Sequence, residues 1–233
     1  MTRINGFLGR RQLLQIAGSS ILMSIGGTIV SQATAIAEQK FETISPDAAL
    51  ARLLDGNKRF IQQKSQHPHQ SQTRLKEVAQ AQHPFATILS CADSRVSGEI
   101  LFDQGIGDLF DIRIAGNIIT PEALGSIEYA AVNLNCPLVM VLGHERCGAV
   151  TAAVKGEPLP GQMSAFVKGI KPAISDIKGF SEEAVEKAVV ENVKYQVHKM
   201  QSNSQLLSQL VDASKLKIVG GRYDLDTGEV III

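Results

Sequence analysis

Two short apolar runs, each followed at once by side chains that can bind a metal, constrain the fold of this chain most. Residues 85–89 lead into Cys91, and residues 137–142 lead into His144 and Cys147. A short apolar run bounded by turn residues is typical of a buried strand. Because parallel strands end at the same edge of a sheet, we expect the side chains that follow the two runs to lie together there.

The rest of the chain alternates between strand-like and helix-like segments. Further strands are expected at 109–114 and 216–220, and helices near 46–60, 75–81, 121–132, 149–154, 163–174, 181–200 and 204–213. Ser45-Pro46-Asp47 is a helix start, with an N-cap, a proline and an acid in the first turn. We expect that helix to loosen at Gly56-Asn57. The turn at Asp226-Thr227-Gly228 predicts a C-terminal hairpin, so the predicted class is α/β, with a mainly parallel sheet flanked by helices.

Composition narrows the possible functions. The 23 basic and 23 acidic residues cancel, so nothing favours nucleic acid as a partner. Three cysteines are too few for a disulfide framework. Cys136, which lies outside the two motifs, is predicted to be a buried structural thiol.

The first 37 residues have the pattern of an export signal. A basic region ends in Arg10-Arg11, an apolar run covers 13–30, and Ala35-Ile36-Ala37 is an A-x-A cleavage site. The paired arginines resemble a twin-arginine signal, which carries folded proteins. The alternative is an uncleaved membrane anchor. We therefore predict that 1–37 is a signal and 38–233 is one zinc-dependent catalytic domain. This domain would lie in the periplasm or an equivalent extracytoplasmic compartment. It would be attached to the membrane only if the signal is not cleaved.

The two motifs together predict a zinc site. Cys91, His144 and Cys147 offer two sulfurs and a nitrogen, and a catalytic Zn²⁺ keeps its fourth position open. Two thiolates neutralise the metal's charge, so another group must help to take the proton of the zinc-bound water or to orient the hydroxide. Asp93 is suited to this role or to the fourth ligand position, and Arg95, on the same face of an extended segment, would keep it ionised. A purely structural Asp93–Arg95 ion pair is the alternative.

Three motifs resemble those of the β-class carbonic anhydrases: Cys91-Ala92-Asp93-Ser94-Arg95, Ala115-Gly116-Asn117 and Gly143-His144-Glu145-Arg146-Cys147-Gly148. The resemblance extends over roughly residues 45–233. It implies reversible hydration of CO2 to bicarbonate and a proton at Zn²⁺, with small molecules as the only substrates. It also implies assembly as homodimers or multiples of dimers.

The resemblance assigns roles to individual residues. The two cysteines and the histidine named above would bind zinc. Asp93 would be the fourth ligand in a closed state or, paired with Arg95, would face the zinc-bound water in an open one. Gln82 matches a substrate-orienting glutamine, and Gly148 matches a position whose backbone faces the substrate. Glu145 departs from the small or short polar residue of many members and could change the charge near zinc.

Two rival functions remain open at the level of sequence. One is a hydrolase of the same fold that acts on CS2 or COS with the same zinc chemistry. The other is a non-catalytic zinc-binding scaffold, against which the presence of Asp93, Arg95 and Gln82 argues.

Overall fold

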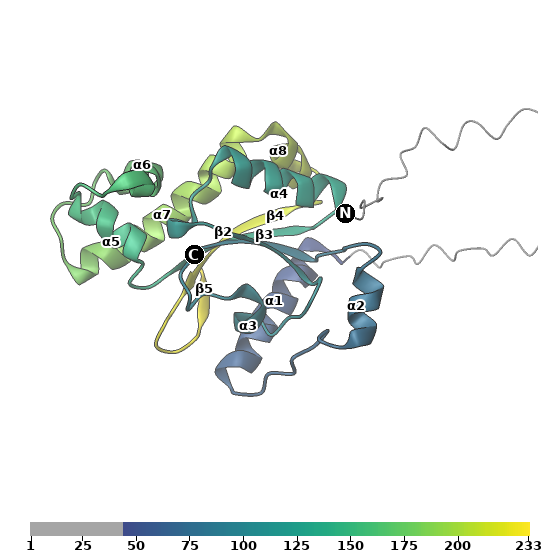
Figure 1. The fold of residues 1–233 in the computed structure, drawn as a ribbon. Helices are drawn as coiled ribbons and strands as arrows, with labels where there is room; N and C mark the ends of the chain where they lie inside the picture. The colour runs from purple at the N-terminus through teal and green to yellow at the C-terminus, as the bar shows by residue number, and fades with distance from the viewer. Residues whose placement is uncertain (1–43) are drawn as a thin grey trace, which may run out of the picture. The chain divides into compact units, whose positions relative to one another are not determined.

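The computed structural model describes residues 44–233, in which five strands form one sheet in the order β2-β1-β3-β4-β5 (Figure 1). The strands are β1 (Ala86–Ser90), β2 (Leu109–Arg113), β3 (Leu138–His144), β4 (Lys217–Tyr223) and β5 (Val230–Ile232). The first four run parallel, and β5 pairs antiparallel with β4 as the predicted hairpin. The predicted fold class is therefore confirmed.

Helices cover both faces of the sheet (Figure 1). On one side lie α1 (Pro46–Ile61), α2 (Gln72–Val78) and α3 (Gly98–Leu101). On the other side lie α4 (Pro121–Asn133), α5 (Gly148–Lys155), α6 (Ser164–Ile170), α7 (Glu182–Asn203) and α8 (Gln205–Asp212). Three short 3-10 helices complete the described part: η1 (Ala115–Asn117), η2 (Gly161–Met163) and η3 (Lys171–Ile174).

The alternation of side chains along β3 explains why two helical layers form. Met140 and Leu142 point into the core beneath α1 and α3, whereas Val139 and Val141 point into the core beneath α4, α7 and α8. All four are fully buried. A strand that is apolar on both faces requires cover on both, as parallel sheets do.

Helix α1 begins as predicted, but it does not loosen in its last turns. The Ser45 hydroxyl caps the first turn, and the helix continues to Ile61. Gly56 allows close packing, because a Cβ there would lie 1.8 Å from the Phe102 carbonyl oxygen. The Asn57 amide bonds to other segments, so it does not compete with its own helix.

The helix expected over 163–174 is instead divided into η2, α6 and η3. Pro172 lies in the last of these pieces, and a proline has no N–H for a regular helical bond. The export signal predicted for residues 1–37 lies outside the described residues. Within residues 44–233, no helix combines the length and apolar character needed to cross a membrane.

Candidate metal centre

The first predicted ligand lies directly beyond the end of β1. Cys91 is buried there, but the chain does not continue as an extended segment. It turns instead, and the Val96 N–H donates to the Asp93 carbonyl oxygen at 3.0 Å. The expectation that the side chains at 91, 93 and 95 share one face of a strand was therefore wrong. The turn nevertheless places Arg95 against Asp93.

Asp93 and Arg95 form a tightly bonded pair. Asp93 Oδ1 accepts from the Arg95 backbone N–H at 3.0 Å and from Nε at 2.9 Å, while Oδ2 accepts from Nη2 at 2.8 Å. The Arg95 guanidinium holds the pKa of the Asp93 carboxyl far below its usual range. Asp93 is therefore ionised at neutral pH, as its predicted role requires.

The second motif places a histidine with one free nitrogen in the interior. His144 is the last residue of β3 and is fully buried. Its Nδ1 lies 2.8 Å from the Glu145 carbonyl oxygen, which can only accept, so Nδ1 carries the proton and Nε2 keeps its lone pair. Nε2 lies 3.9 Å from Asp93 Oδ2 and has no hydrogen-bond partner among residues 44–233. A buried nitrogen without a partner is costly unless something binds it.

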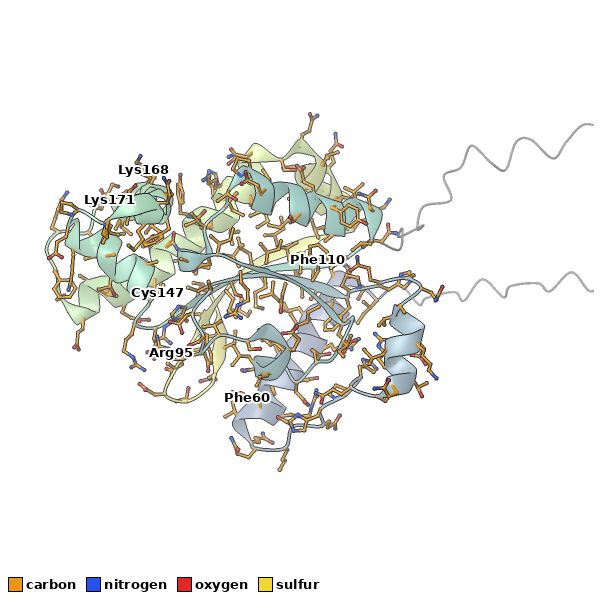
Figure 2. All side chains as sticks on the ribbon, in the orientation of Figure 1. Phe60, Arg95, Phe110, Cys147, Lys168 and Lys171 are labelled. Carbon is orange, nitrogen blue, oxygen red and sulfur yellow. The ribbon has the colours of Figure 1, made fainter. Side chains whose placement is uncertain are left out.

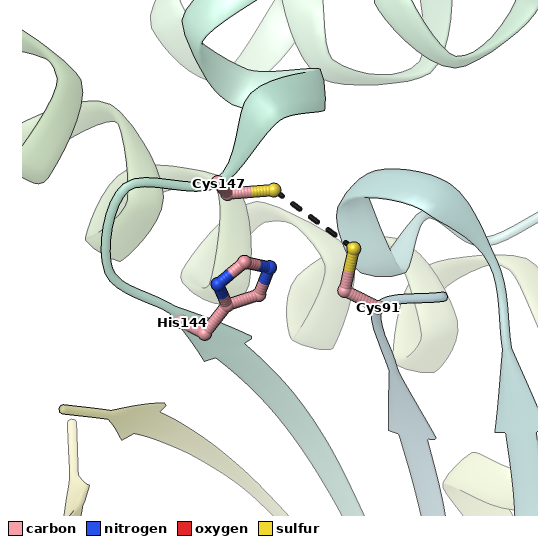
Figure 3. Close-up of side chains that lie close together, drawn as sticks. All are labelled: Cys91, His144 and Cys147. Atoms are coloured by element: carbon pink, nitrogen blue, oxygen red, sulfur yellow. Dashed lines mark hydrogen bonds between the residues drawn. The ribbon is translucent and has the colours of Figure 1, made fainter. Parts of the chain in front are cut away.

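The two cysteine sulfurs complete the site around that nitrogen (Figure 3). Cys91 Sγ and Cys147 Sγ lie 4.0 Å apart, and the ligand atoms of both cysteines and His144 all lie within 4.8 Å of one another. Zinc–sulfur bonds of about 2.3 Å at a tetrahedral angle place two sulfurs about 3.8 Å apart. The spacing therefore fits one zinc ion.

The charge of the sulfur pair also fits a cation. The hydrogen bond between them lowers the pKa of Cys91 to about 4 and raises the pKa of Cys147 well above its usual range. Cys91 is therefore the sulfur that more readily carries a negative charge. A divalent ion between the sulfurs would stabilise both as thiolates.

Two features near Cys91 were missed by the sequence reasoning. The Gly116 N–H donates to Cys91 Sγ at 3.4 Å. The Arg113 guanidinium donates to the carbonyl oxygens of Cys91 at 3.2 Å and Asp93 at 2.6 Å, which fixes the turn. Arg113 ends β2 at the same sheet edge, so the rule that sites gather at that edge could have identified it.

Glu145 was expected to change the charge near zinc, but its carboxylate is bound elsewhere. It accepts from Arg222 and from the Leu225 N–H at 3.1 Å. The neighbouring Arg146 forms a two-bond pair with Asp226, each bond 2.8 Å long. These contacts balance the Glu145 charge and tie the loop between β3 and α5 to the C-terminal hairpin.

The two predicted substrate-binding residues lie in different places. Gly148 follows Cys147 as the first residue of α5, and a Cβ there would meet no atom within 4 Å, so its backbone faces open space. Gln82 is exposed and precedes β1, whereas Cys91 follows that strand. Five strand residues at about 3.3 Å each separate the two sheet edges by roughly 16 Å. A single chain therefore does not bring Gln82 to the metal cluster, which lies with Arg95 and Cys147 at the other edge (Figure 2).

Comparison with known proteins agrees with this geometry. Residues 86–230 match the family model described as carbonic anhydrase. Carbonic anhydrase 2 of Mycobacterium tuberculosis is 40% identical over 192 residues, which cover 81% of this chain and 93% of that protein. The carbonic anhydrase of Mycolicibacterium smegmatis is 40% identical over 190 residues, or 80% of this chain and 92% of that protein. The chain belongs to the β-carbonic anhydrase family.

Solved structures of the same family share the fold. A Coccomyxa β-carbonic anhydrase in complex with acetazolamide is 26% identical with a TM-score of 0.64, over 79% of this chain and 86% of that one. The β-carbonic anhydrase CafA of Aspergillus fumigatus is 27% identical with a TM-score of 0.64, over 80% and 89% of the two chains. The mostly parallel sheet flanked by helices is thus the β-carbonic anhydrase fold.

Proposed function

We propose that this protein catalyses the reversible hydration of CO2 to bicarbonate and a proton, with Zn²⁺ held by Cys91, His144 and Cys147. The observation that carries the proposal is the buried His144 Nε2, which has no partner among the described residues and lies beside two sulfurs 4.0 Å apart. Zinc bound there would supply a Lewis acid that lowers the pKa of water towards neutrality. Membership of the carbonic anhydrase family supports CO2 as the substrate.

Asp93 is the proposed hydrogen-bond acceptor at the centre. Arg95 occupies both of its oxygens, while Oδ2 remains 3.9 Å from His144 Nε2. This arrangement favours the open state, in which Asp93 is an acceptor, over the closed state, in which it is a fourth ligand. Because its pKa is held so low, Asp93 orients a proton donor by accepting a hydrogen bond and does not store the proton.

Gly148 and Gln82 are proposed to face the substrate. The open space at Gly148, next to Cys147, supports the first assignment. Gln82 lies at the opposite sheet edge from its own metal cluster, so it can act only in the centre of a neighbouring subunit. The proposed function therefore includes a homodimer, or a multiple of dimers, in which each chain supplies Gln82 to its partner.

A mixing experiment tests this exchange of residues. Gln82→Leu chains lack the glutamine but keep an intact metal centre. Asp93→Asn chains have a defective centre but keep Gln82. If sites form between the two subunits of a dimer, co-expression should restore about a quarter of wild-type activity, because one site in four then has both groups. Each homodimer alone should be nearly inactive, and no recovery in isolated mixed dimers would show that Gln82 does not act in the centre of a neighbouring subunit.

The proposed reaction is tested by stopped-flow CO2 hydration on protein assayed for zinc. We expect fast turnover that is lost on chelation and restored by zinc. Zinc at one ion per chain with hydrolysis of CS2 or COS, and no CO2 turnover, would replace the proposal with the hydrolase reading. Zinc with neither activity would indicate a non-catalytic scaffold.

Export of the folded protein and cleavage after residue 37 also remain proposals, supported by the arginine pair and the A-x-A site. Cell fractionation and the N-terminal sequence of the native protein would test both. A cytoplasmic protein with an intact N-terminus would contradict them.

A further inference from the structure

We propose that Asn192, on α7, is a positioning residue that holds Gly116 by its carbonyl oxygen, so that the Gly116 N–H bonds to the Cys91 sulfur. The inference rests on the proposed zinc site and adds a residue that no motif identified. It begins with an unusual feature of α7. This helix buries seven side chains, and the two polar ones are Asn192 and Gln196, both fully inaccessible to solvent.

Both buried amides bond to the loop that follows β2. Asn192 Nδ2 donates to the Gly116 carbonyl oxygen at 2.9 Å. Gln196 Nε2 donates to Asn192 Oδ1 at 3.0 Å and so fixes which way the Asn192 amide faces. Gln196 Oε1 accepts from the Ile119 N–H at 2.9 Å. Buried polar groups in a low dielectric make strong bonds when they are satisfied, so this pair holds the loop firmly.

Only glycine fits the conformation and the packing at position 116. Gly116 has a φ of +74°, which favours glycine, and a Cβ at this residue would lie 2.7 Å from Ile170 Cδ1. Gly116 makes two bonds. Its carbonyl oxygen accepts from Asn192, and its N–H donates to Cys91 Sγ at 3.4 Å. Asn192 therefore acts on Cys91 through a single residue.

The chemical consequence concerns the sulfur as a ligand. An N–H bond to a thiolate fixes the direction of its lone pairs and withdraws electron density from it. Groups that bond to metal ligands in this way affect metal affinity, and their loss costs about 10- to 100-fold. A leucine at position 192 would be similar in size to asparagine, but it could not donate to the Gly116 carbonyl oxygen.

The test compares Asn192→Ala with Met200→Ala in the full-length protein. Met200 is also fully buried on α7, and its side chain packs in the core beneath α4 and α8. Both variants lose buried side-chain atoms, but only the first removes the bond to Gly116. Zinc affinity is measured by competition with a chromophoric chelator, and Co²⁺ is added to metal-free protein to record the sulfur-to-cobalt charge-transfer band.

We expect Asn192→Ala to bind zinc about 10- to 100-fold more weakly and to shift the cobalt band, while Met200→Ala keeps the wild-type values. Wild-type affinity and an unchanged band in Asn192→Ala would overturn the inference. Equal weakening in both variants would also overturn it, because the effect would then come from a general loss of packing. A wild-type protein without tight zinc binding or a thiolate–cobalt band would instead refute the proposed function.

A measurement on the unmodified protein keeps the inference testable if Asn192→Ala does not fold. Labelling alanine carbonyls with ¹³C and glycine nitrogens with ¹⁵N selects the Ala-Gly peptides, which occur at 17–18 and 115–116. In the zinc-loaded protein, the Gly116 amide proton should lie downfield and exchange slowly, as expected for a bond to the Cys91 sulfur. An ordinary chemical shift with fast exchange would contradict the inference.

Discussion

Two groups of side chains in the described part of this protein bring three potential ligand atoms within 4.8 Å of one another, and they differ in every other respect. The first is the proposed metal centre of Cys91, His144 and Cys147, whose members are all buried. The second, the acidic cluster of Glu145, Asp224 and Asp226, is partly or fully exposed. They are close neighbours in sequence, because Glu145 follows His144.

The two groups differ in whether their potential ligand atoms already have charge or hydrogen-bond partners in the protein. In the acidic cluster, Arg222 neutralises Glu145 and Arg146 neutralises Asp226. At the three-residue site, His144 Nε2 has no partner among the described residues, and it lies beside two sulfurs that are 4.0 Å apart. Proximity of ligand atoms is therefore weak evidence for a metal, and buried atoms left without partners are much stronger evidence. Each of the following predictions would sharpen or break this contrast.

The largest effect is expected from removing a ligand of the metal centre. Cys147→Ser should weaken zinc binding by at least about 1000-fold, because a tetrahedral site loses one of its three protein ligands. CO2 hydration should disappear with the metal. The matched control is Cys136→Ser, since Cys136 is buried as predicted and, within residues 44–233, its sulfur bonds to Thr87 and to the Leu138 carbonyl oxygen and lies outside the three-residue site. Equal zinc content in both variants would show that Cys147 is not a zinc ligand and would contradict the proposed metal centre.

The next effect separates catalysis from metal binding. Asp93→Asn should keep zinc but lose about 100-fold or more in CO2 hydration, because an amide cannot replace an ionised acceptor. Arg95→Ala should act in the same direction, since it frees Asp93 to bind the metal. Zinc content and stopped-flow rates on the same preparation check both variants. Full activity in Asp93→Asn would show that the Asp93–Arg95 pair is only structural.

A change in the acidic cluster should affect stability and leave the metal in place. Glu145→Gln weakens the bonds to Arg222 and the Leu225 N–H, and we expect a loss of about 1–2 kcal/mol in the free energy of unfolding. Denaturant unfolding of the zinc-free protein measures this loss. Zinc affinity should stay within about twofold of wild type, since the ligand atoms are unchanged. A large fall in zinc affinity would mean that the two groups work as one site.

The smallest effect should come from Asp226→Asn and should depend on pH. Arg146 lowers the pKa of the Asp226 carboxyl below its ordinary value of 3.8. The ionised form therefore stabilises the fold above that ordinary pKa, and this contribution is lost as pH falls through the lower folded value. Wild type should melt slightly above Asp226→Asn at neutral pH, and the difference should vanish in strong acid. A constant difference at every pH would assign the effect to packing.

Sequence reasoning predicted the fold class and the grouping of Cys91, His144 and Cys147, because both depend on local patterns. Apolar runs of strand length identified β1 and β3, and parallel strands bring Cys91 and His144 to one edge. The turn at Cys91 was not predicted, because it depends on the bond from Val96 and on Arg113 across the sheet. The burial of Asn192 was not predicted either, because an asparagine within a helix gives no sign of what it will contact.

The most direct test of the account is the zinc K-edge X-ray absorption of the purified protein. If the buried group is the metal centre, the spectrum should show two sulfur neighbours at about 2.3 Å and two nitrogen or oxygen neighbours near 2.0 Å. A shell of oxygen alone would place the metal at the acidic cluster and contradict the assignment of Cys91, His144 and Cys147.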